Sequence, residues 1–135
     1  TRFLQSTAKI HYAMKANSHP RLLKTFAQMG LGVDVVSLGE LQKAMRFGFR
    51  PEKVIFSGVG KGAEEVGFAI QQKILQINAE SFEEVEMIEA LARESQRKAA
   101  IALRVNIHLT APTHKHIQTA TESSKFGLDV RLLPD

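Results

Sequence analysis

Residues 33–48, VDVVSLGELQKAMRFG, contain one complete strand-to-helix unit. The first four residues are three valines around one aspartate, which suits a buried β-strand. Ser37 followed three residues later by Glu40 is the capping-box pattern that begins a helix. Apolar side chains then recur at helical spacing, and Gly48 is a typical residue at which a helix ends. The stretch therefore predicts a β-strand that leads directly into an amphipathic helix.

The same unit recurs along the chain. Five β-rich runs begin at Ile10, Val33, Val54, Ile74 and Ala99. Successive runs thus start 23, 21, 20 and 25 residues apart. Helix signals fill the intervals, around residues 20–30, 37–48 and 64–72 and from the second capping-box pattern, Ser81 with Glu84, onward. Because the runs are apolar with little strict alternation, they favour parallel strands that helices bury on both faces.

Five strands and four helices are compatible with a doubly wound sheet or with part of an eight-fold barrel. A complete barrel typically has ~250 residues, whereas this chain has 135. The chain also begins with Thr1 rather than Met, and a further element is expected to begin at residues 130–135. We therefore expect an α/β domain that is a piece of a larger protein.

The composition is that of a globular chain and excludes several classes of function. Lys and Arg number 18 against 14 Asp and Glu, which gives a formal charge of +4, and 44% of the residues are hydrophobic. No run approaches the ~18 consecutive apolar residues of a membrane span, and the opening residues Thr1 to Leu4 lack the long apolar stretch that a signal peptide is expected to have. The chain has no cysteine, which excludes disulfides and thiolate metal sites and fits the reducing cytoplasm.

The basic residues do not form a nucleic-acid-binding stripe. They are spread from Arg2 to Arg131 among acidic and polar residues, and the chain has one Tyr and no Trp for base stacking. A surface that follows a phosphate backbone combines clustered basic residues with stacking aromatics. We therefore expect neither a nucleic acid nor a membrane as partner, but a small molecule.

Functional residues of α/β folds follow the carboxyl ends of the strands. This rule selects Lys15, Ala16, Asn17, Asp34, Ser37, Ser57, Gly58, Asn78, Glu80, Arg104 and Asn106. Lys15 is unusual, because the converging strand ends are expected to form a crowded and partly dry environment. Desolvation there favours the neutral, nucleophilic form of a lysine amine. The alternative is an ordinary surface lysine at the start of a loop.

Five blocks of the chain match one known family in order and spacing. They are YAMKAN (12–17), VDVVSLGEL (33–41), FSGVGK (56–61), LRVN (103–106) and KFG (125–127). Together they resemble the fold type III pyridoxal-phosphate decarboxylases. The resemblance implies a partial (β/α)8 TIM-type barrel of about five βα units, pyridoxal 5'-phosphate as cofactor, and a carboxy-lyase that acts on an amino acid. Alanine racemases share the KAN block but usually continue with an aromatic residue and glycines, where this chain has Ser18, His19 and Pro20.

The resemblance also implies roles for four residues. Lys15 is the catalytic lysine that binds the cofactor covalently, Asp34 lies near the cofactor ring, and Glu40 and Arg104 are further cofactor-binding residues. Each of the last three has a structural alternative. Glu40 is also the carboxylate of the capping box, and Arg104 could extend from a strand end into solvent. Asp34 stands between two valines, where an unpaired carboxylate is costly to bury, and this favours a site or a salt bridge.

Residues 113–119, THKHIQT, bear on the substrate. They resemble the segment that precedes KFG in diaminopimelate decarboxylases, which implies decarboxylation of meso-diaminopimelate to L-lysine in lysine biosynthesis. His116 replaces a frequent Tyr and Ala120 a common Gly, so ornithine-type and arginine-type decarboxylases remain alternatives, as does a non-catalytic βα ligand-binding domain. His108, His114 and His116 could form a metal site, but the resemblance explains one of them without a metal, and we expect none.

The family pattern has further parts that this chain does not contain. The glycine-rich phosphate cradle, the acidic partner of the pyridine nitrogen and the carboxy-terminal β-domain are not found in residues 1–135. We therefore expect residues 1–135 to be one partial pyridoxal-phosphate-binding barrel domain, with the second half of the barrel and the β-domain outside it. The resemblance implies a homodimer for the full-length protein, and we expect the fragment alone to be inactive.

Overall fold

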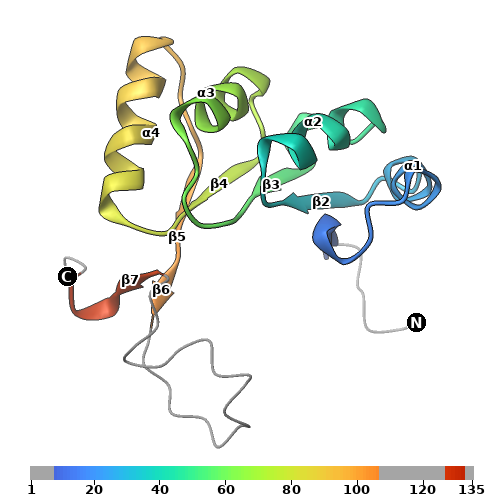
Figure 1. Ribbon diagram of the computed structural model, residues 1–135, viewed down its shortest axis with the longest axis horizontal. Coiled ribbons are helices and arrows are strands. Elements are labelled where there is room, and N and C mark those ends of the chain that lie inside the picture. Colours follow the sequence, from blue (N-terminus) through green and yellow to red (C-terminus); the bar gives the residue numbers. More distant parts are fainter. Residues whose placement is uncertain (1–7, 107–126, 133–135) are drawn as a thin grey trace, which may run out of the picture.

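The computed structural model describes residues 8–106 and 127–132, and Figure 1 shows how their elements follow one another. The strands in these ranges are β1 (His11–Ala13), β2 (Gly32–Val35), β3 (Val54–Phe56), β4 (Gln76–Ala79), β5 (Ile101–Leu103), β6 (Val105–Asn106) and β7 (Leu128–Asp129). The α-helices are α1 (Pro20–Gln28), α2 (Leu38–Arg46), α3 (Ala63–Gln72) and α4 (Phe82–Glu94). Short 3-10 helices are η1 (Met14–Ala16), η2 (Pro51–Lys53) and η3 (Val130–Leu132). The predicted alternation of five strands and four helices is confirmed.

The first five strands form one parallel sheet in the order β1-β2-β3-β4-β5. Each strand therefore pairs with the next one along the chain. Because strand-to-strand crossovers are right-handed, a sequential order places all connecting helices on the same face of the sheet. Figure 1 shows α2, α3 and α4 on one side of the strands. A doubly wound sheet would instead reverse its strand order at a switch point, so the fold is that of a partial (β/α) barrel.

Arg104 separates β5 from β6 and connects the five-stranded sheet with the two-stranded sheet of β6 and β7 through two backbone hydrogen bonds. The Arg104 N–H donates to the carbonyl of Ala79 on β4 at 2.9 Å, and the Arg104 carbonyl accepts from Leu128 N–H at 2.7 Å. Strand β6 then pairs in parallel with β7. Of residues 130–135, where a further element was expected, Val130–Leu132 form the 3-10 helix η3 directly after β7, and residues 133–135 lie outside the described residues.

The hydrophobic core lies between the sheet and its helices. In the paired register Val33, Val54, Phe56, Ile77 and their neighbours share one face, and these side chains are almost fully buried. The helices contribute apolar residues that include Leu23, Leu41, Ala44, Val66, Ala69 and Ile88. Burial of this apolar surface against helices on a single face is the main stabilising contribution to the fold.

The prediction that the strands are buried on both faces is wrong. Helices cover one face only, and the opposite face of β2 and β4 carries Asp34, Gln76 and Asn78, which are half-buried. At the edge, Ile101 and Leu103 of β5 are about two-fifths exposed, at 41% and 42%. Asp34, Gln76 and Asn78 all line one cavity on this uncovered face.

Both predicted helix starts are confirmed, with one difference in detail. The Ser37 hydroxyl accepts from Glu40 N–H, and the Ser81 hydroxyl accepts from Glu84 N–H, each at 3.2 Å. In a standard capping box the glutamate returns to the amide of the capping serine. Here each glutamate reaches one residue further back, Glu40 to Val36 N–H at 2.9 Å and Glu84 to the amide before Ser81 at 3.0 Å. The two carboxylates therefore fix the strand ends as well as the helix starts.

The longest helix in the described part of the chain, α4, has 13 residues. Across residues 8–106 and 127–132, none of the helices has the length and apolar character that crossing a membrane requires.

Candidate active site

A cavity of ≈ 620 Å³ opens at the carboxyl ends of the strands. Its volume lies in the range typical of small-molecule sites. The lining residues come from η1, from β2, β4 and β5, and from the segments that follow β2 to β5. They are Lys15, Asp34, Val36, Ser57, Gly58, Val59, Gln76, Asn78, Glu80, Ala102, Leu103 and Arg104. The structure thus brings together three of the four residues that the sequence assigned to the site.

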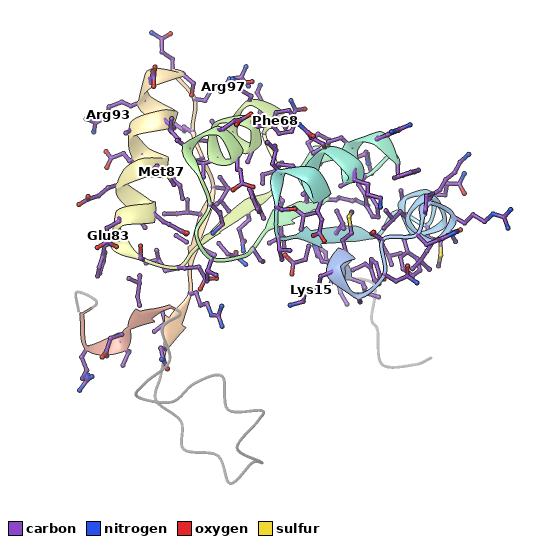
Figure 2. All side chains as sticks on the ribbon, in the orientation of Figure 1. Lys15, Phe68, Glu83, Met87, Arg93 and Arg97 are labelled. Carbon is purple, nitrogen blue, oxygen red and sulfur yellow. The ribbon has the colours of Figure 1, made fainter. Side chains whose placement is uncertain are left out.

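Lys15 lies in η1, directly after β1, and its side chain is exposed. Figure 2 shows it on the side of the sheet opposite α2 and α3. The Tyr12 hydroxyl donates to the Asn17 carbonyl at 2.9 Å, and Asn17 Oδ1 accepts from His19 N–H at 2.9 Å. These bonds fix the turn that presents Lys15. In this structure the expected crowded and dry surroundings of Lys15 are not found, because η1 carries the lysine past the end of the sheet.

Asp34 is central in β2 and faces the same cavity. Its Oδ1 atom is buried and has no hydrogen-bond partner among the described residues. A buried polar atom without a partner is costly and rare in a folded protein. Asp34 therefore offers a directed acceptor to a donor group of a ligand, as its position between two valines suggested.

Arg104 is held at the rim of the cavity by an acidic partner. Its Nη1 atom donates to both carboxylate oxygens of Glu80, at 3.0 and 3.2 Å. The Glu80 side chain is 8% exposed and that of Arg104 is 44% exposed. Gly127 packs on the arginine with φ +85°, and a Cβ atom there would lie 3.0 Å from the Arg104 carbonyl oxygen. The arginine is thus oriented by the ion pair, and a free extension into solvent is not what the structure shows.

Glu40 does not line the cavity. Its carboxylate accepts from Val36 N–H at 2.9 Å, and its own amide donates to Ser37. Both contacts serve the start of α2, which is the capping interpretation of this residue. Glu40 reaches the site only through the backbone of Val36, which does line the cavity.

A hydrogen-bonded row of polar side chains crosses the floor of the cavity. Gln76 Nε2 donates to Asn78 Oδ1 at 2.6 Å, and Asn78 Nδ2 donates to Ser57 Oγ at 2.9 Å. The strand-end rule had selected Ser57, Asn78 and Glu80 without giving them a role. Gln76 was missed, although the two-residue period of a strand places it on the same face as Asn78 and Glu80.

Within the described ranges, no group of three or more His, Asp or Glu side chains is placed to hold a metal ion. His108, His114 and His116, which were considered for a metal site, lie outside the described residues, as do residues 113–119 and Ala120. Lys125 of the KFG block lies outside them as well.

The residues of the cavity fit pyridoxal phosphate in three respects. Lys15 offers an accessible primary amine, which the aldehyde carbon of the cofactor requires. Asp34 offers a buried acceptor that lacks a donor. Arg104 offers a positive charge of fixed orientation for an anionic group.

The family model described as "Pyridoxal-dependent decarboxylase, pyridoxal binding domain" matches residues 2–134. The diaminopimelate decarboxylase of Helicobacter pylori strain J99 is 44% identical over 120 residues, which cover 89% of this chain and 30% of that protein. The diaminopimelate decarboxylase of Aquifex aeolicus is 42% identical over 124 residues, covering 92% of this chain and again 30% of the relative. The chain therefore spans about 30% of the length of these relatives.

Solved structures give the same result. The crystal structure of diaminopimelate decarboxylase from Helicobacter pylori complexed with L-lysine has a TM-score of 0.83 at 42% identity, over 89% of this chain and 30% of that one. The arginine decarboxylase of Paramecium bursaria Chlorella virus bound to agmatine has a TM-score of 0.75 at 25% identity, over 92% of this chain and 31% of that one. The resemblance seen in five short blocks is confirmed, and the chain belongs to the pyridoxal-dependent decarboxylases, whose pyridoxal-binding domain its residues 2–134 match.

Proposed function

We propose that the whole protein is a pyridoxal-phosphate-dependent decarboxylase that converts meso-diaminopimelate to L-lysine. In this proposal residues 1–135 supply about five βα units of its cofactor-binding barrel. The observation that carries the proposal is the convergence of Lys15, Asp34 and Arg104 on one cavity at the strand ends. An ordinary surface lysine would not be expected to line the same cavity as a carboxylate with a buried, unpartnered Oδ1 atom and an arginine held by an ion pair.

Each of these residues has a separate task in the proposal. Lys15 binds the cofactor covalently through Nζ. Asp34 orients the cofactor by accepting a hydrogen bond at Oδ1, and Arg104, fixed by Glu80, pairs with an anionic group. Bound pyridoxal phosphate supplies the electron sink that decarboxylation needs. Ser57 and Asn78 line the floor of the cavity. The hydrogen bond between them fixes the positions of their side chains.

The choice of substrate rests on the relatives. The diaminopimelate decarboxylases of Helicobacter pylori strain J99 and Aquifex aeolicus are 44% and 42% identical to this chain, while the viral arginine decarboxylase is 25% identical. A site that pairs the distal carboxylate and ammonium of diaminopimelate disfavours substrates that leave such groups unpaired. We therefore place this protein in the diaminopimelate branch and not in the ornithine or arginine branch.

We also propose that the whole protein is a cytoplasmic homodimer. The absence of cysteine in 135 residues fits a reducing compartment, and the family resemblance supports the dimer. Light scattering of the purified whole protein gives its mass directly. A mass of two chains would support the dimer, and a mass of one chain at working concentration would contradict it.

One competition assay tests the substrate. The whole protein is given equal concentrations of meso-diaminopimelate, ornithine, arginine and lysine, each labelled in turn, and release of carbon dioxide is measured. We expect meso-diaminopimelate to have the highest kcat/KM. An equal or higher kcat/KM for ornithine or arginine would move the protein to that branch and leave the role of Lys15 intact. No release from any of them would favour a non-catalytic ligand-binding domain.

A further inference from the structure

Lys61 is a buried cation that the proposed chemistry does not use. Its side chain is 2% exposed, and it lies in the loop between β3 and α3. A buried ammonium group is tolerated only when it is paired and hydrogen-bonded. The Nζ atom of Lys61 donates to the carbonyl of Gly58 at 2.5 Å and to Glu84 Oε2 at 3.0 Å, and it lies 5.8 Å from the ring centroid of Phe56. Lys61 thus has a complete set of partners inside the protein.

Glu84 connects this lysine to the next βα unit. Its side chain is 11% exposed and belongs to α4, whereas Lys61 precedes α3. The Oε2 atom that pairs with Lys61 also accepts from the Glu80 N–H at 3.0 Å. One carboxylate oxygen therefore joins the loop that follows β3 to the loop that follows β4.

Both loops carry residues of the cavity. The first presents Ser57, Gly58 and Val59, and the second presents Glu80. Gly58 has φ +103°, and a Cβ atom there would lie 3.0 Å from the Val36 carbonyl oxygen, so its backbone is tightly placed. Glu80 in turn holds Arg104 at 3.0 Å. Through Lys61 the buried pair fixes the carbonyl of Gly58, and through Glu84 it fixes the backbone of Glu80, the partner of Arg104.

We propose that Lys61 and Glu84 are positioning residues that hold the two cavity loops in register and thereby orient Arg104. This inference rests on the proposed function. Neither residue lines the cavity, so they act through Gly58 and Glu80 and not on a ligand. Two apolar side chains could fill the same space and are often no less stabilising than a buried ion pair. They could not hold a carbonyl and an amide of different loops at the same time, which explains why a charged pair stands here.

The test uses the whole protein with Lys61→Met/Glu84→Gln, which removes both charges and leaves an acceptor for the Glu80 amide. The matched control is Arg93→Met/Glu89→Gln, an exposed ion pair of 2.6 Å on the same helix. Figure 2 shows Arg93 on α4 facing away from the sheet. Four quantities are measured: Tm, amide hydrogen exchange in residues 57–62 and 80–84, the Kd of pyridoxal phosphate with its visible circular dichroism, and kcat/KM.

For the Lys61/Glu84 variant we expect a Tm within a few degrees of wild type, faster amide exchange in both loops and an altered visible dichroism. We expect a loss of about 10- to 100-fold in kcat/KM, as for a misplacement of about 1 Å in a site. The control variant should match wild type in all four. Unchanged exchange, Kd and dichroism in a folded Lys61/Glu84 variant would overturn the inference.

A second variant keeps the test decisive if the double variant does not fold. In Lys61→Met the Glu84 carboxylate, which is 11% exposed, keeps its bond to the Glu80 N–H, and no buried ammonium group is left unpaired. We expect faster amide exchange in residues 57–62 but not in residues 80–84, together with an altered visible dichroism, and wild-type exchange in residues 57–62 would overturn the positioning role. Wild-type protein that binds no pyridoxal phosphate would refute the proposed function, and the exchange measurement would still decide the role of the pair.

Discussion

Asp34 combines a cost to the fold with a use in the site. Its Oδ1 atom is buried without a partner among the described residues, and such atoms are retained in functional sites more often than elsewhere. Lys15, by contrast, is exposed and its turn is held by the hydroxyl of Tyr12. The site thus combines an accessible nucleophile, Lys15, with a buried acceptor, Asp34 Oδ1, to which a ligand could donate a hydrogen bond.

We predict that Asp34→Asn weakens cofactor binding and does not weaken the fold. An amide replaces an unpaired buried carboxylate, so the free energy of unfolding of the cofactor-free whole protein should stay equal or rise. The Kd of pyridoxal phosphate should rise about 5- to 10-fold, since a hydrogen bond to a charged acceptor contributes about 1 to 1.5 kcal/mol more than one to the neutral amide oxygen that replaces it. Absorbance titration measures the Kd, with the exposed Glu86→Gln as control. A wild-type Kd in Asp34→Asn would remove Asp34 from the site.

Glu40 allows a direct test of capping against cofactor binding. Glu40→Gln keeps an oxygen that can accept from Val36 N–H, so we predict wild-type cofactor affinity. Glu40→Ala loses that bond and should lower the free energy of unfolding by about 1 kcal/mol. Denaturant unfolding and cofactor titration of both variants supply the numbers. If Glu40→Gln binds the cofactor tenfold more weakly while it unfolds like wild type, the carboxylate has a role at the cofactor that its capping contacts do not explain.

At the scale of elements, the starts of the helices could be read from short patterns. Ser37 with Glu40 and Ser81 with Glu84 marked helix starts that the structure confirms. The shift of each glutamate to the amide before the serine could not be predicted, because it depends on where the preceding strand ends in space. The burial of Lys61 could not be predicted either, since its partner Glu84 lies 23 residues away along the chain, on α4.

The face of the sheet opposite the helices shows a second limit of sequence reasoning. Strands with few alternating polar residues favoured burial on both faces, yet the polar positions Asp34, Gln76 and Asn78 line a cavity. The strand-end rule found most of the lining because parallel strands bring their carboxyl ends to one edge. It missed Gln76, which lies at the beginning of β4 and enters the lining through the period of the strand.

The first turn of α4 gives a prediction at this scale. The Ser81 side chain lowers the pKa of the Glu83 carboxyl below its usual value, and the carboxyl is fully exposed. A carboxyl whose pKa is lower in the folded state than in the unfolded state stabilises the fold when the pH is above the unfolded-state pKa. This stabilisation is lost as the pH falls through the folded-state pKa. Ser81→Ala should therefore raise the pKa of Glu83 toward its ordinary value.

The same substitution should lower the free energy of unfolding by about 1 kcal/mol, because the hydroxyl that accepts from Glu84 N–H is lost. Nuclear magnetic resonance titration and denaturant unfolding measure the two effects. Ser95→Ala at the other end of α4 is the control, since its hydroxyl accepts no amide of a helix start. An unchanged Glu83 pKa in Ser81→Ala would show that the serine is not the cause.

At the scale of the whole molecule, the sequential strand order decides between the two architectures that the sequence left open. With each strand beside its successor, the helices gather on one face and the polar strand ends gather on the other. Residues that follow or belong to β1 to β5 line one cavity there. The candidate site is thus a consequence of the topology.

We predict that residues 1–135 expressed alone are marginally stable and inactive. Among the strands that the structure describes, β1 pairs on one side only, and the exposed Ile101 and Leu103 leave apolar surface in solvent. Unpaired strand edges and uncovered apolar faces promote association. Sedimentation and denaturant unfolding followed by circular dichroism should show oligomers or a non-cooperative transition. A cooperatively folded monomer that releases carbon dioxide from meso-diaminopimelate would contradict this expectation.

The covalent attachment of the cofactor tests the central claim most directly. Whole protein incubated with pyridoxal phosphate is reduced with borohydride, digested and mapped by mass spectrometry. Lys15 should carry the label, because it is the accessible amine of the cavity, while Lys61 is buried in an ion pair. A label on Lys9, Lys24 or Lys61 in place of Lys15 would contradict the account.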